Sequence, residues 1–536
     1  MAVKRHTSPT RKRGFQRTSA DWPSTALAEP VAHGGTSMGR PMRNHLLFAA
    51  ATFCLLVAAG CSEVRAAAPP AESWDVYYMD DAKVGHSHAT RRDVEENGQK
   101  LQQVENTAQM TMSRLGQKVT IEMNILFVEQ ANGDIVRFES NVKMANMPMK
   151  SKGTVKDGKL TIEGQVLGRP VNTVVDCPAG TGGADVIERS LAGAPLKPGE
   201  KRELKMLMPM FNVVATVVLK AADFEETKLL EGKKARLLRI EGETIVPGQA
   251  PMLSTAWADD KGMILKSVER AGMMVTAYRT TKEVALREGN GKTPDLITLS
   301  IVKVTPQPRG PHSAAKVVYR ATLKDGDPAK VFPAGRSQTV KSMGDHEAEI
   351  TVQRVRPGDG QAADKAKQPT DDDRKPNVLI QSDDEKVIEL ANEVAKKETD
   401  PWKVAVALER HVRESMKSAD FSQALASAAE VARTRRGDCT EHAVLLAAMA
   451  RARGIPARVA VGLVYAAPLG GFAFHMWTEV WIKDRWIPLD GTLGKGGIGG
   501  GHLKLNDSNL ADGSPTSFLT VYQVMGKLGL KVVSEE

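Results

Sequence analysis

Residues 472–490 read FAFHMWTEVWIKDRWIPLD, and their alternation of apolar and polar residues predicts two short antiparallel strands joined by a tight turn. With residues 483–484 as a two-residue loop, Trp477 pairs with Asp490. Residues that pair across a hairpin share a face of the sheet, so Asp490 lies on the same face as His475 and diagonal to it. The stretch therefore predicts an imidazole with a carboxylate within side-chain reach.

A cysteine lies upstream of this hairpin, at the predicted start of a helix. Residues 440–452 are rich in Ala and Leu, and they are followed by Gly454 and Pro456, which are typical of helix ends. Cys439 thus falls at a helix N-terminus, where free N–H groups and the helix dipole favour a thiolate and lower the thiol pKa. Taken alone, a small buried residue at a helix start is the favoured interpretation of Cys439.

A thiol, an imidazole and a carboxylate together predict nucleophilic chemistry. In this arrangement Cys439 attacks a carbonyl group, while His475 holds the thiolate as an ion pair and later protonates the leaving amine. Asp490 fixes the tautomer of the imidazole and stabilises its charged form. The backbone N–H of Cys439 is the one oxyanion donor that the sequence assigns.

Four blocks around these residues resemble the core of the transglutaminase-like superfamily. In chain order they are residues 437–441 (GDCTE), 454–458 (GIPAR), 475–480 (HMWTEV) and 486–490 (WIPLD). The resemblance covers about residues 380–495 and implies a papain-like fold with a catalytic triad of Cys439, His475 and Asp490. It also implies thioester chemistry on peptide or protein amides. Gly491 departs from the family pattern, which usually has Pro after the Asp.

The resemblance leaves the acceptor open, because an amine gives crosslinking and water gives hydrolysis. We therefore predict a transglutaminase-like cysteine acyltransferase or an amidase or protease that acts on a protein or peptide substrate. No acidic loop has calcium-site spacing, and we expect no cofactor and no metal. The alternative from another class is a catalytically inactive binding or scaffold protein of the envelope with a relic fold, but an intact triad argues against it.

The start of the chain has the pattern of an export signal. Basic residues 42–45 precede an apolar run of fifteen residues, 46–60, which is long enough for a signal peptide and short for a membrane span. Cleavage after residues 64–66 gives a soluble exported protein, whereas residues 58–61 resemble a lipobox with Cys61 as the lipidated residue. Both patterns predict the periplasm or cell envelope, and a lipid on Cys61 would anchor the protein to a membrane.

The net charge of +9 says little about a partner, because residues 1–66 contribute +6 of it. Aromatic residues make up only 5% of the 536 residues, so a stacking surface for nucleic acid is not expected. We predict no nucleic-acid partner. The sequence leaves the oligomeric state and the natural substrate open.

The chain is long enough for several domains, and we predict a multidomain α+β protein. N-terminal antiparallel β-rich domains are followed by a papain-like transglutaminase core. The expected parts are a leader at 1–66, a β-rich domain at 67–295, a small β segment at 296–356, a linker at 357–376 and a catalytic domain at 377–536. The β-rich domain is expected to curve around a hydrophobic interior, similar to exported lipoprotein carriers, and lipid or lipoprotein carriage is a second alternative function.

Local signals add further expectations. Ser382 with Glu385 predicts a capping box at a helix start, and Asp400-Pro401 predicts the start of the next helix. The alternating methionines Met206, Met208 and Met210 could bind Cu(I), but apolar core filling is the favoured interpretation. His442, one turn after Cys439, could neighbour the site, but a helix surface is the favoured interpretation, and Cys177 is expected to be structural.

Overall fold

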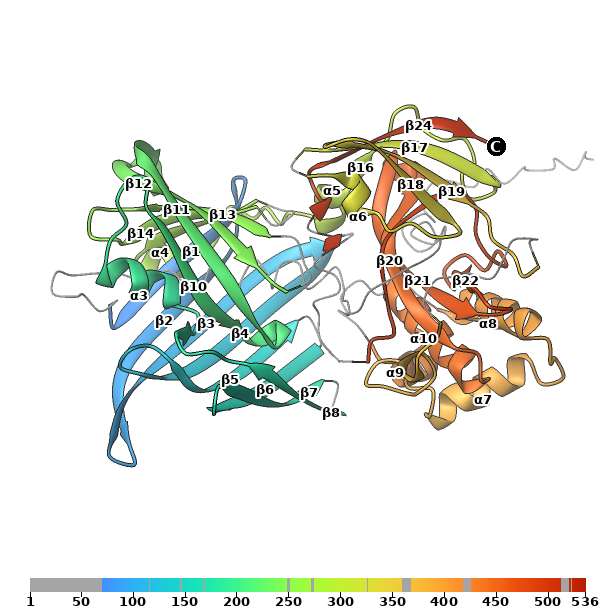
Figure 1. The fold of residues 1–536 in the computed structure, drawn as a ribbon, viewed down its shortest axis with the longest axis horizontal. Helices are drawn as coiled ribbons and strands as arrows, with labels where there is room; N and C mark the ends of the chain where they lie inside the picture. The colour runs from blue at the N-terminus through green and yellow to red at the C-terminus, as the bar shows by residue number, and fades with distance from the viewer. Residues whose placement is uncertain are drawn as a thin grey trace, which may run out of the picture.

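The computed structural model describes residues 70–114, 116–144, 147–166, 169–247, 251–270, 274–324, 326–358, 368–417, 426–511, 520–521 and 523–536. The expected leader, with its lipobox residue Cys61, lies outside these ranges. Figure 1 shows two halves, a β-rich one in blue and green and a mixed α/β one in yellow to red. The chain is thus a multidomain α+β protein, as predicted. Within the described ranges, no helix has both the length and the apolar character needed to cross a membrane.

The first half, here called the sheet domain, is one sheet of fifteen strands in the order β8 to β1, then β15 to β9. All neighbouring strands are antiparallel except the short β9–β10 pair. The strands are β1 (Glu72–Met79), β2 (Ala82–Glu96), β3 (Gln99–Arg114), β4 (Gln117–Gln130), β5 (Ile135–Met144), β6 (Met147–Lys156), β7 (Lys159–Val166), β8 (Arg169–Asp176), β9 (Thr181–Gly182), β10 (Lys201–Met208), β11 (Val213–Lys228), β12 (Lys234–Ile245), β13 (Met252–Ala258), β14 (Ile264–Glu269) and β15 (Val275–Thr280). Helix α3 (Val186–Gly193) lies between β9 and β10, and α4 (Lys282–Leu286) follows the sheet.

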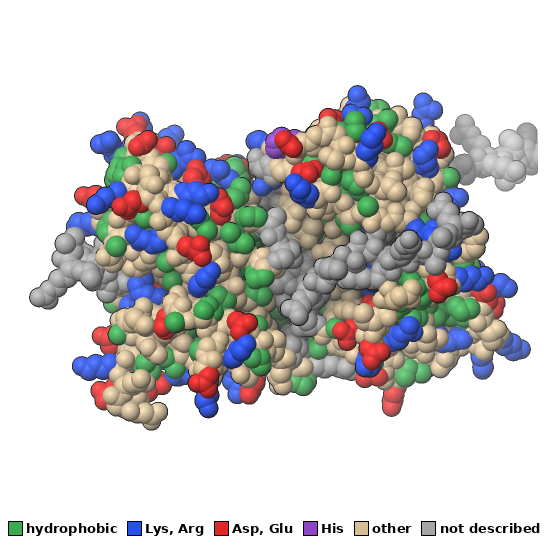
Figure 2. All heavy atoms as spheres, in the orientation of Figure 1, with side chains coloured by type: hydrophobic (Ala, Val, Ile, Leu, Met, Phe, Trp, Pro, Cys, Tyr) green, Lys and Arg blue, Asp and Glu red, His purple; other side chains and the backbone are tan. Residues whose placement is uncertain are grey.

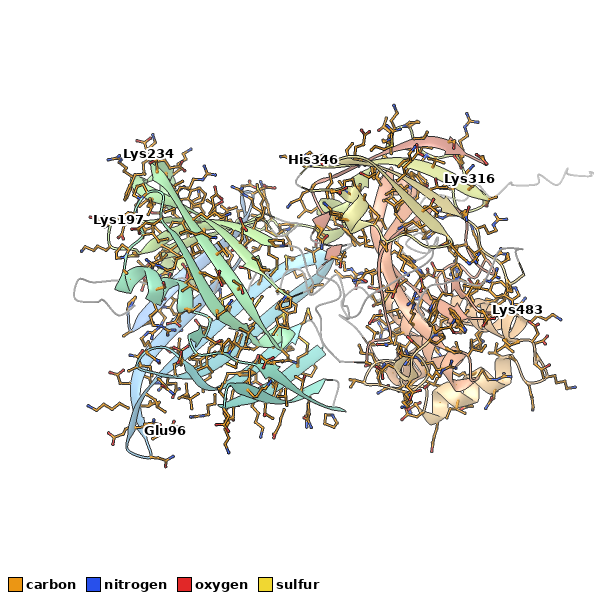
Figure 3. All side chains as sticks on the ribbon, in the orientation of Figure 1. Glu96, Lys197, Lys234, Lys316, His346 and Lys483 are labelled. Carbon is orange, nitrogen blue, oxygen red and sulfur yellow. The ribbon has the colours of Figure 1, made fainter. Side chains whose placement is uncertain are left out.

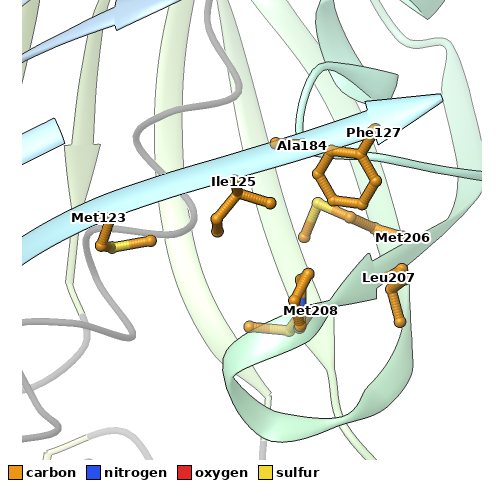
Figure 4. Close-up of a pocket in the computed structure, with 8 residues that line it drawn as sticks. Met123, Ile125, Phe127, Ala184, Met206, Leu207 and Met208 are labelled. Carbon is orange, nitrogen blue, oxygen red and sulfur yellow. The ribbon is translucent and has the colours of Figure 1, made fainter. Parts of the chain in front are cut away.

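The sheet curls around a methionine-rich interior. Strands β4 and β10 are far apart in the strand order, yet both line one small apolar pocket, which Figure 4 shows. Met206 and Met208 of β10 face Phe127 of β4 there, and they are buried together with Met210, which confirms their assignment to the core. The pocket encloses about 10 Å³, which is room for about one water molecule, so side chains fill the interior.

The second half contains a five-stranded sheet with the order β16-β21-β20-β23, and β22 also pairs with β21. Its strands are β16 (Val302–Lys303), β20 (Ala457–Ala466), β21 (Gly471–Trp481), β22 (Trp486–Leu489) and β23 (His502–Ser508). The helices are α7 (Glu385–Val394), α8 (Pro401–Ser415), α9 (Ala428–Thr434) and α10 (Cys439–Ala452). Helix α10 packs against the other three helices and against β20 and β21, so it is buried on all sides.

A second, four-stranded sheet has the order β18-β19-β17-β24. Its strands are β17 (Lys316–Leu323), β18 (Gln338–Gly344), β19 (Glu347–Gln353) and β24 (Leu528–Glu535), and the short helices α5 (Leu296–Ser300) and α6 (Pro328–Val331) belong to the same region. The expected small β segment 296–356 therefore completes its sheet with a strand from the far end of the expected catalytic domain. Its strand β16 also pairs with β21, so the two segments fold together.

The two predicted helix starts differ in outcome. Asp400 caps α8 and Pro401 takes the first helical position, as predicted. The Ser382 cap is wrong, because α7 is capped by Asp384, whose carboxylate accepts hydrogen bonds from the N–H groups of Lys386 and Val387. Both Ser and Asp cap helices well, and the sequence alone did not decide between two candidates two residues apart.

A buried ion cluster joins three neighbouring strands of the five-stranded sheet, β21, β20 and β23. Glu479 of β21 accepts from Lys504 of β23 at 2.5 Å and from Arg458 of β20. Asp507 pairs with Arg458 at 2.9 Å and with Lys504 at 2.7 Å. The side chains of Lys504 and Glu479 are completely buried, so the two acids and two bases neutralise each other away from water.

We expect Lys504→Met to lower the free energy of unfolding of this half by about 3 kcal/mol, because two buried carboxylates then share one guanidinium. Denaturant titration followed by tryptophan fluorescence measures the loss. Lys220→Met is the matched control, since the Lys220–Glu243 pair is half exposed on the sheet domain and contributes no more than about 1 kcal/mol. Equal losses in the two variants would contradict the prediction.

Candidate active site

The motif at 437–441 forms the start of α10. Asp438 is the N-cap, and its Oδ1 accepts from the N–H of Thr440 at 2.8 Å. Glu441 completes the capping box, because its Oε2 accepts a hydrogen bond from the N–H of Asp438 at 2.8 Å. Gly437 has a φ of +141°, and a Cβ there would lie 2.3 Å from Cγ of Glu441. The motif is thus a capping box that places Cys439 in the first turn of a central helix.

The thiol lies at a gap in the edge of β21. Strand β20 pairs along one edge of β21. On the other edge β16 pairs at Gly471 and Phe472, and β22 pairs only from Thr478 onward. Between them the backbone N–H of Met476 donates a hydrogen bond toward the sulfur of Cys439. The sulfur therefore lies beside the residue that follows His475.

The hairpin has the register that its sequence predicts. Thr478 pairs with Leu489, and both loop residues, 483–484, have positive φ angles, as a tight two-residue turn requires. In Figure 3 the side chain of Lys483 marks the tip of this hairpin at the outer surface. The other end of the hairpin, which carries the predicted acid, lies inside the domain.

The structure brings His475 and Asp490 together. Nε2 of His475 and Oδ2 of Asp490 are 2.8 Å apart, and both side chains are buried. Oδ1 of Asp490 accepts from the N–H of Thr492 at 2.6 Å and also from its hydroxyl group. In the part of the chain that the structure describes, Nδ1 of His475 has no hydrogen-bond partner. With its proton held on Nε2 by the carboxylate, the neutral ring keeps Nδ1 as its basic atom.

Two residues that the sequence analysis missed hold the acid in place. Thr492 follows Asp490 by two positions, which is the spacing of an Asx-turn and is the signal that could have found it. Glu409 of α8 accepts from the N–H of Asp490 at 2.8 Å and from that of Gly496 at 2.6 Å. Burial raises the pKa of Glu409 to about 8. No sequence signal connects Glu409 to this loop, because α8 meets it only in the fold.

The glycine at position 491 has a packing reason. A Cβ at Gly491 would lie 2.8 Å from Cγ1 of Val412 in α8 and 3.3 Å from the carbonyl oxygen of His442 in α10. Two helices thus approach the backbone directly after Asp490. The departure from the family pattern at this position follows from that close approach.

The predicted lowering of the Cys439 pKa is wrong for this conformation. The side chain is only 2% exposed, and burial raises the pKa of the thiol well above its ordinary value. The carboxylate of Asp438 adds to the rise, whereas Arg114 and the N–H of Met476 oppose it. The sequence indicated the helix N-terminus correctly, but it carried no information on how completely the surrounding elements exclude water.

His442 does not lie on a helix surface, which corrects the second expectation for this region. It is buried, with Nδ1 2.6 Å from the carbonyl oxygen of Asp438, and burial lowers the pKa of its imidazole. The surface assignment assumed that α10 has one solvated face, and this helix has none. Cys177 is a free, buried thiol in the sheet domain, as expected for a structural cysteine.

One contact at the site comes from the sheet domain. Arg114, the last residue of β3, donates from its guanidinium to Oδ2 of Asp438. The two side chains are 3% and 1% exposed, respectively. The neighbouring carboxylates raise the pKa of Arg114 above its ordinary value although burial opposes its charge. Sequence reasoning could not find this pair, because 324 residues separate its partners.

Other kinds of site receive no support. Among the residues with described positions, no group of three or more His, Cys, Asp or Glu side chains could hold a metal ion. Figure 2 shows basic and acidic side chains mixed over both halves of the visible face. A continuous basic surface is therefore not a feature of that face.

Comparison with protein families matches residues 388–491 to the transglutaminase-like superfamily. No curated protein matches the sequence significantly. Among solved structures, the chain is similar to a candidate cysteine protease from Cytophaga hutchinsonii, with 16% identity, 41% of this chain and 86% of that chain covered, and a TM-score of 0.24. A β-barrel-like protein of unknown function from Brucella abortus has 10% identity, coverages of 39% and 95%, and a TM-score of 0.30.

A candidate protease from Parabacteroides distasonis has 11% identity, coverages of 65% of this chain and 64% of that chain, and a TM-score of 0.18. The family match includes Cys439 at the start of α10 and the paired side chains of His475 and Asp490. Residues 388–491 of this chain are therefore transglutaminase-like.

Proposed function

We propose that this protein is an exported thiol enzyme that acts on peptide or protein amides through a thioester on Cys439. The main support is the 2.8 Å contact between Nε2 of His475 and Oδ2 of Asp490, which leaves Nδ1 as the base. The hydrogen bond from the N–H of Met476 to the sulfur of Cys439 adds support, because Met476 is the residue that follows His475.

The chemistry runs in two steps. In the first, the thiol transfers its proton to His475, the sulfur of Cys439 bonds to the amide carbon, and the leaving amine takes the proton from the imidazolium. In the second, His475 takes a proton from water or another amine as it attacks the thioester carbon, the C–S bond breaks, and the sulfur takes the proton back. The N–H of Cys439 belongs to the first turn of α10, where N–H groups have no partner within the helix, and it can stabilise the oxyanion in both steps.

The proposal covers both hydrolysis and acyl transfer to an amine. Because Cys439 is almost fully buried, the site must open before an amide can reach the sulfur. The rival function is a catalytically inactive binding or scaffold protein of the envelope, and the burial and raised pKa of the thiol are the observations that favour it.

Cys439→Ala is expected to abolish turnover, because no other group of the proposed triad can form the thioester. A labelled amine and labelled peptides, offered to the purified protein, measure acyl transfer and hydrolysis separately. Mass spectrometry of envelope proteins from cells with each form identifies the natural substrates. Cys177→Ala is the matched control and should keep full activity, since that thiol lies in the sheet domain. If wild type and Cys439→Ala behave alike, the enzyme proposal fails and the scaffold function stands.

Asp490→Asn should keep the fold and lose activity by several orders of magnitude, because an amide favours the wrong imidazole tautomer. Thr492→Val removes one hydrogen bond to the same carboxylate and should cost only about three- to tenfold in kcat/KM. Steady-state kinetics with circular dichroism as the folding check measures both. Similar losses in the two variants would argue against an orienting role for Asp490.

The apolar run 46–60 and the lipobox pattern at 58–61 support a periplasmic or envelope location. We expect the full chain to fractionate with membranes and Cys61→Ser to be released as a soluble exported protein, because a lipid on Cys61 would be its anchor. Cell fractionation with labelled fatty acid measures both. An unprocessed wild type in the cytoplasm would contradict export, and an unlabelled but exported wild type would contradict lipidation.

A further inference from the structure

The turn between β3 and β4 is fastened to the segment that leads into the C-terminal half. Oδ2 of Asp295 accepts from Oγ of Ser113 at 3.1 Å and from the N–H of Gly116 at 3.2 Å. The N–H of Ser113 also donates to the carbonyl oxygen of Pro294 at 2.9 Å. Asp295 in turn caps α5, which packs against both β3 and β21. Arg114 therefore extends from a turn whose place is fixed by both halves.

Figure 1 shows β3 and β4 reaching from the sheet domain toward the C-terminal half. At their end, Arg114 binds the oxygen of Asp438 that does not cap α10. The titratable groups around the thiol come from four places: Asp438, Glu441 and His442 at α10, Arg114 of β3, His475 of β21 and Asp490 beyond β22. Arg114 is the permanent cation in this set.

The balance of charge explains why a cation is needed there. Burial raises the pKa of Glu441, and the neighbouring charge of Asp438 adds to the rise. Asp438 is almost fully buried directly before the nucleophile and forms an ion pair with Arg114, and a buried anion there opposes formation of a second one. Arg114 offsets this charge as the partner of opposite sign on Oδ2, beside the hydrogen bond that Oδ1 accepts from Thr440.

We propose that Arg114 is a positioning residue of the active site, supplied by the sheet domain, which neutralises Asp438 and so allows the Cys439 thiolate to form. This inference rests on the proposed function, because it assigns a role toward the same nucleophile. The direction of the charge effects agrees with it, since Asp438 raises the pKa of Cys439 and Arg114 lowers it. The catalytic domain is then electrostatically incomplete without the sheet domain.

The test is the pH dependence of Cys439 alkylation by iodoacetamide in the full chain, measured by mass spectrometry of the peptide that contains Cys439. Arg114→Met should raise the midpoint of the profile by about one pH unit, which means about tenfold less thiolate below the midpoint. Arg114→Lys keeps the charge and should stay near the wild-type midpoint. Arg137→Met is the matched control, because Arg137 binds Glu96 elsewhere in the sheet domain, and its midpoint should not change.

Two further variants separate charge from mere attachment of the two halves. Asp438→Asn keeps a capping side chain but removes the anion, so its midpoint should fall. The double variant Arg114→Met/Asp438→Asn removes both charges and should return toward the wild-type midpoint, although the bond between the halves is gone. Because the double variant removes both charges of the pair, it leaves no unpaired charge in the buried site and should fold. It therefore provides the test if Arg114→Met does not fold.

The inference is overturned if Arg114→Met leaves the midpoint unchanged, even when alkylation becomes faster at every pH, because Arg114 then only covers the thiol. It is equally overturned if the double variant stays as high as Arg114→Met, which would indicate a structural tie. Alkylation does not depend on turnover. An unmoved midpoint in a protein that needs Cys439 for activity therefore rejects this inference and leaves the proposed function standing.

Discussion

The carboxylate of Asp438 holds the rest of the site in place, because its two oxygens serve two different parts of the molecule. Oδ1 caps α10 and so fixes the turn that contains Cys439. Oδ2 binds Arg114 and so joins the sheet domain to the same turn. Since α10 packs against three helices and two strands, any shift of this cap would have to move the centre of the C-terminal half.

The imidazole is held by stacking as well as by its acid. The ring of His475 stacks with that of Trp477 at a centroid distance of 6.1 Å, and the ring of His502 lies 6.2 Å from His475. These rings come from two strands of one sheet, β21 and β23, and all three are buried. An imidazole confined in this way loses little further freedom when it reacts, which is the physical meaning of a preorganised base.

Much of the site could be predicted from the sequence where short-range rules decide. The number of residues in a hairpin loop decides which side chains of the two strands share a face. The two-residue loop at 483–484 therefore predicted the contact between His475 and Asp490. The helix start at Cys439 followed from local composition. The thiol pKa and the role of Arg114 could not be predicted, because burial and interdomain pairing arise only when strands from distant parts of the chain pack together. The sequence was sufficient to assign the methionines of β10 to the core, but it did not predict that β4 is the strand that faces them.

The four-stranded sheet has a consequence for the order of folding. β17 pairs with β24, and helices α7 to α10 with strands β20 to β23 lie in the chain between β19 and β24. Closing so long a loop carries a large entropy cost, and contacts between distant segments form slowly. We therefore expect the helices and strands between them to collapse first and to bring the two flanking segments together. Docking of the last strand is then a late event, which completes the scaffold around a centre that is already assembled.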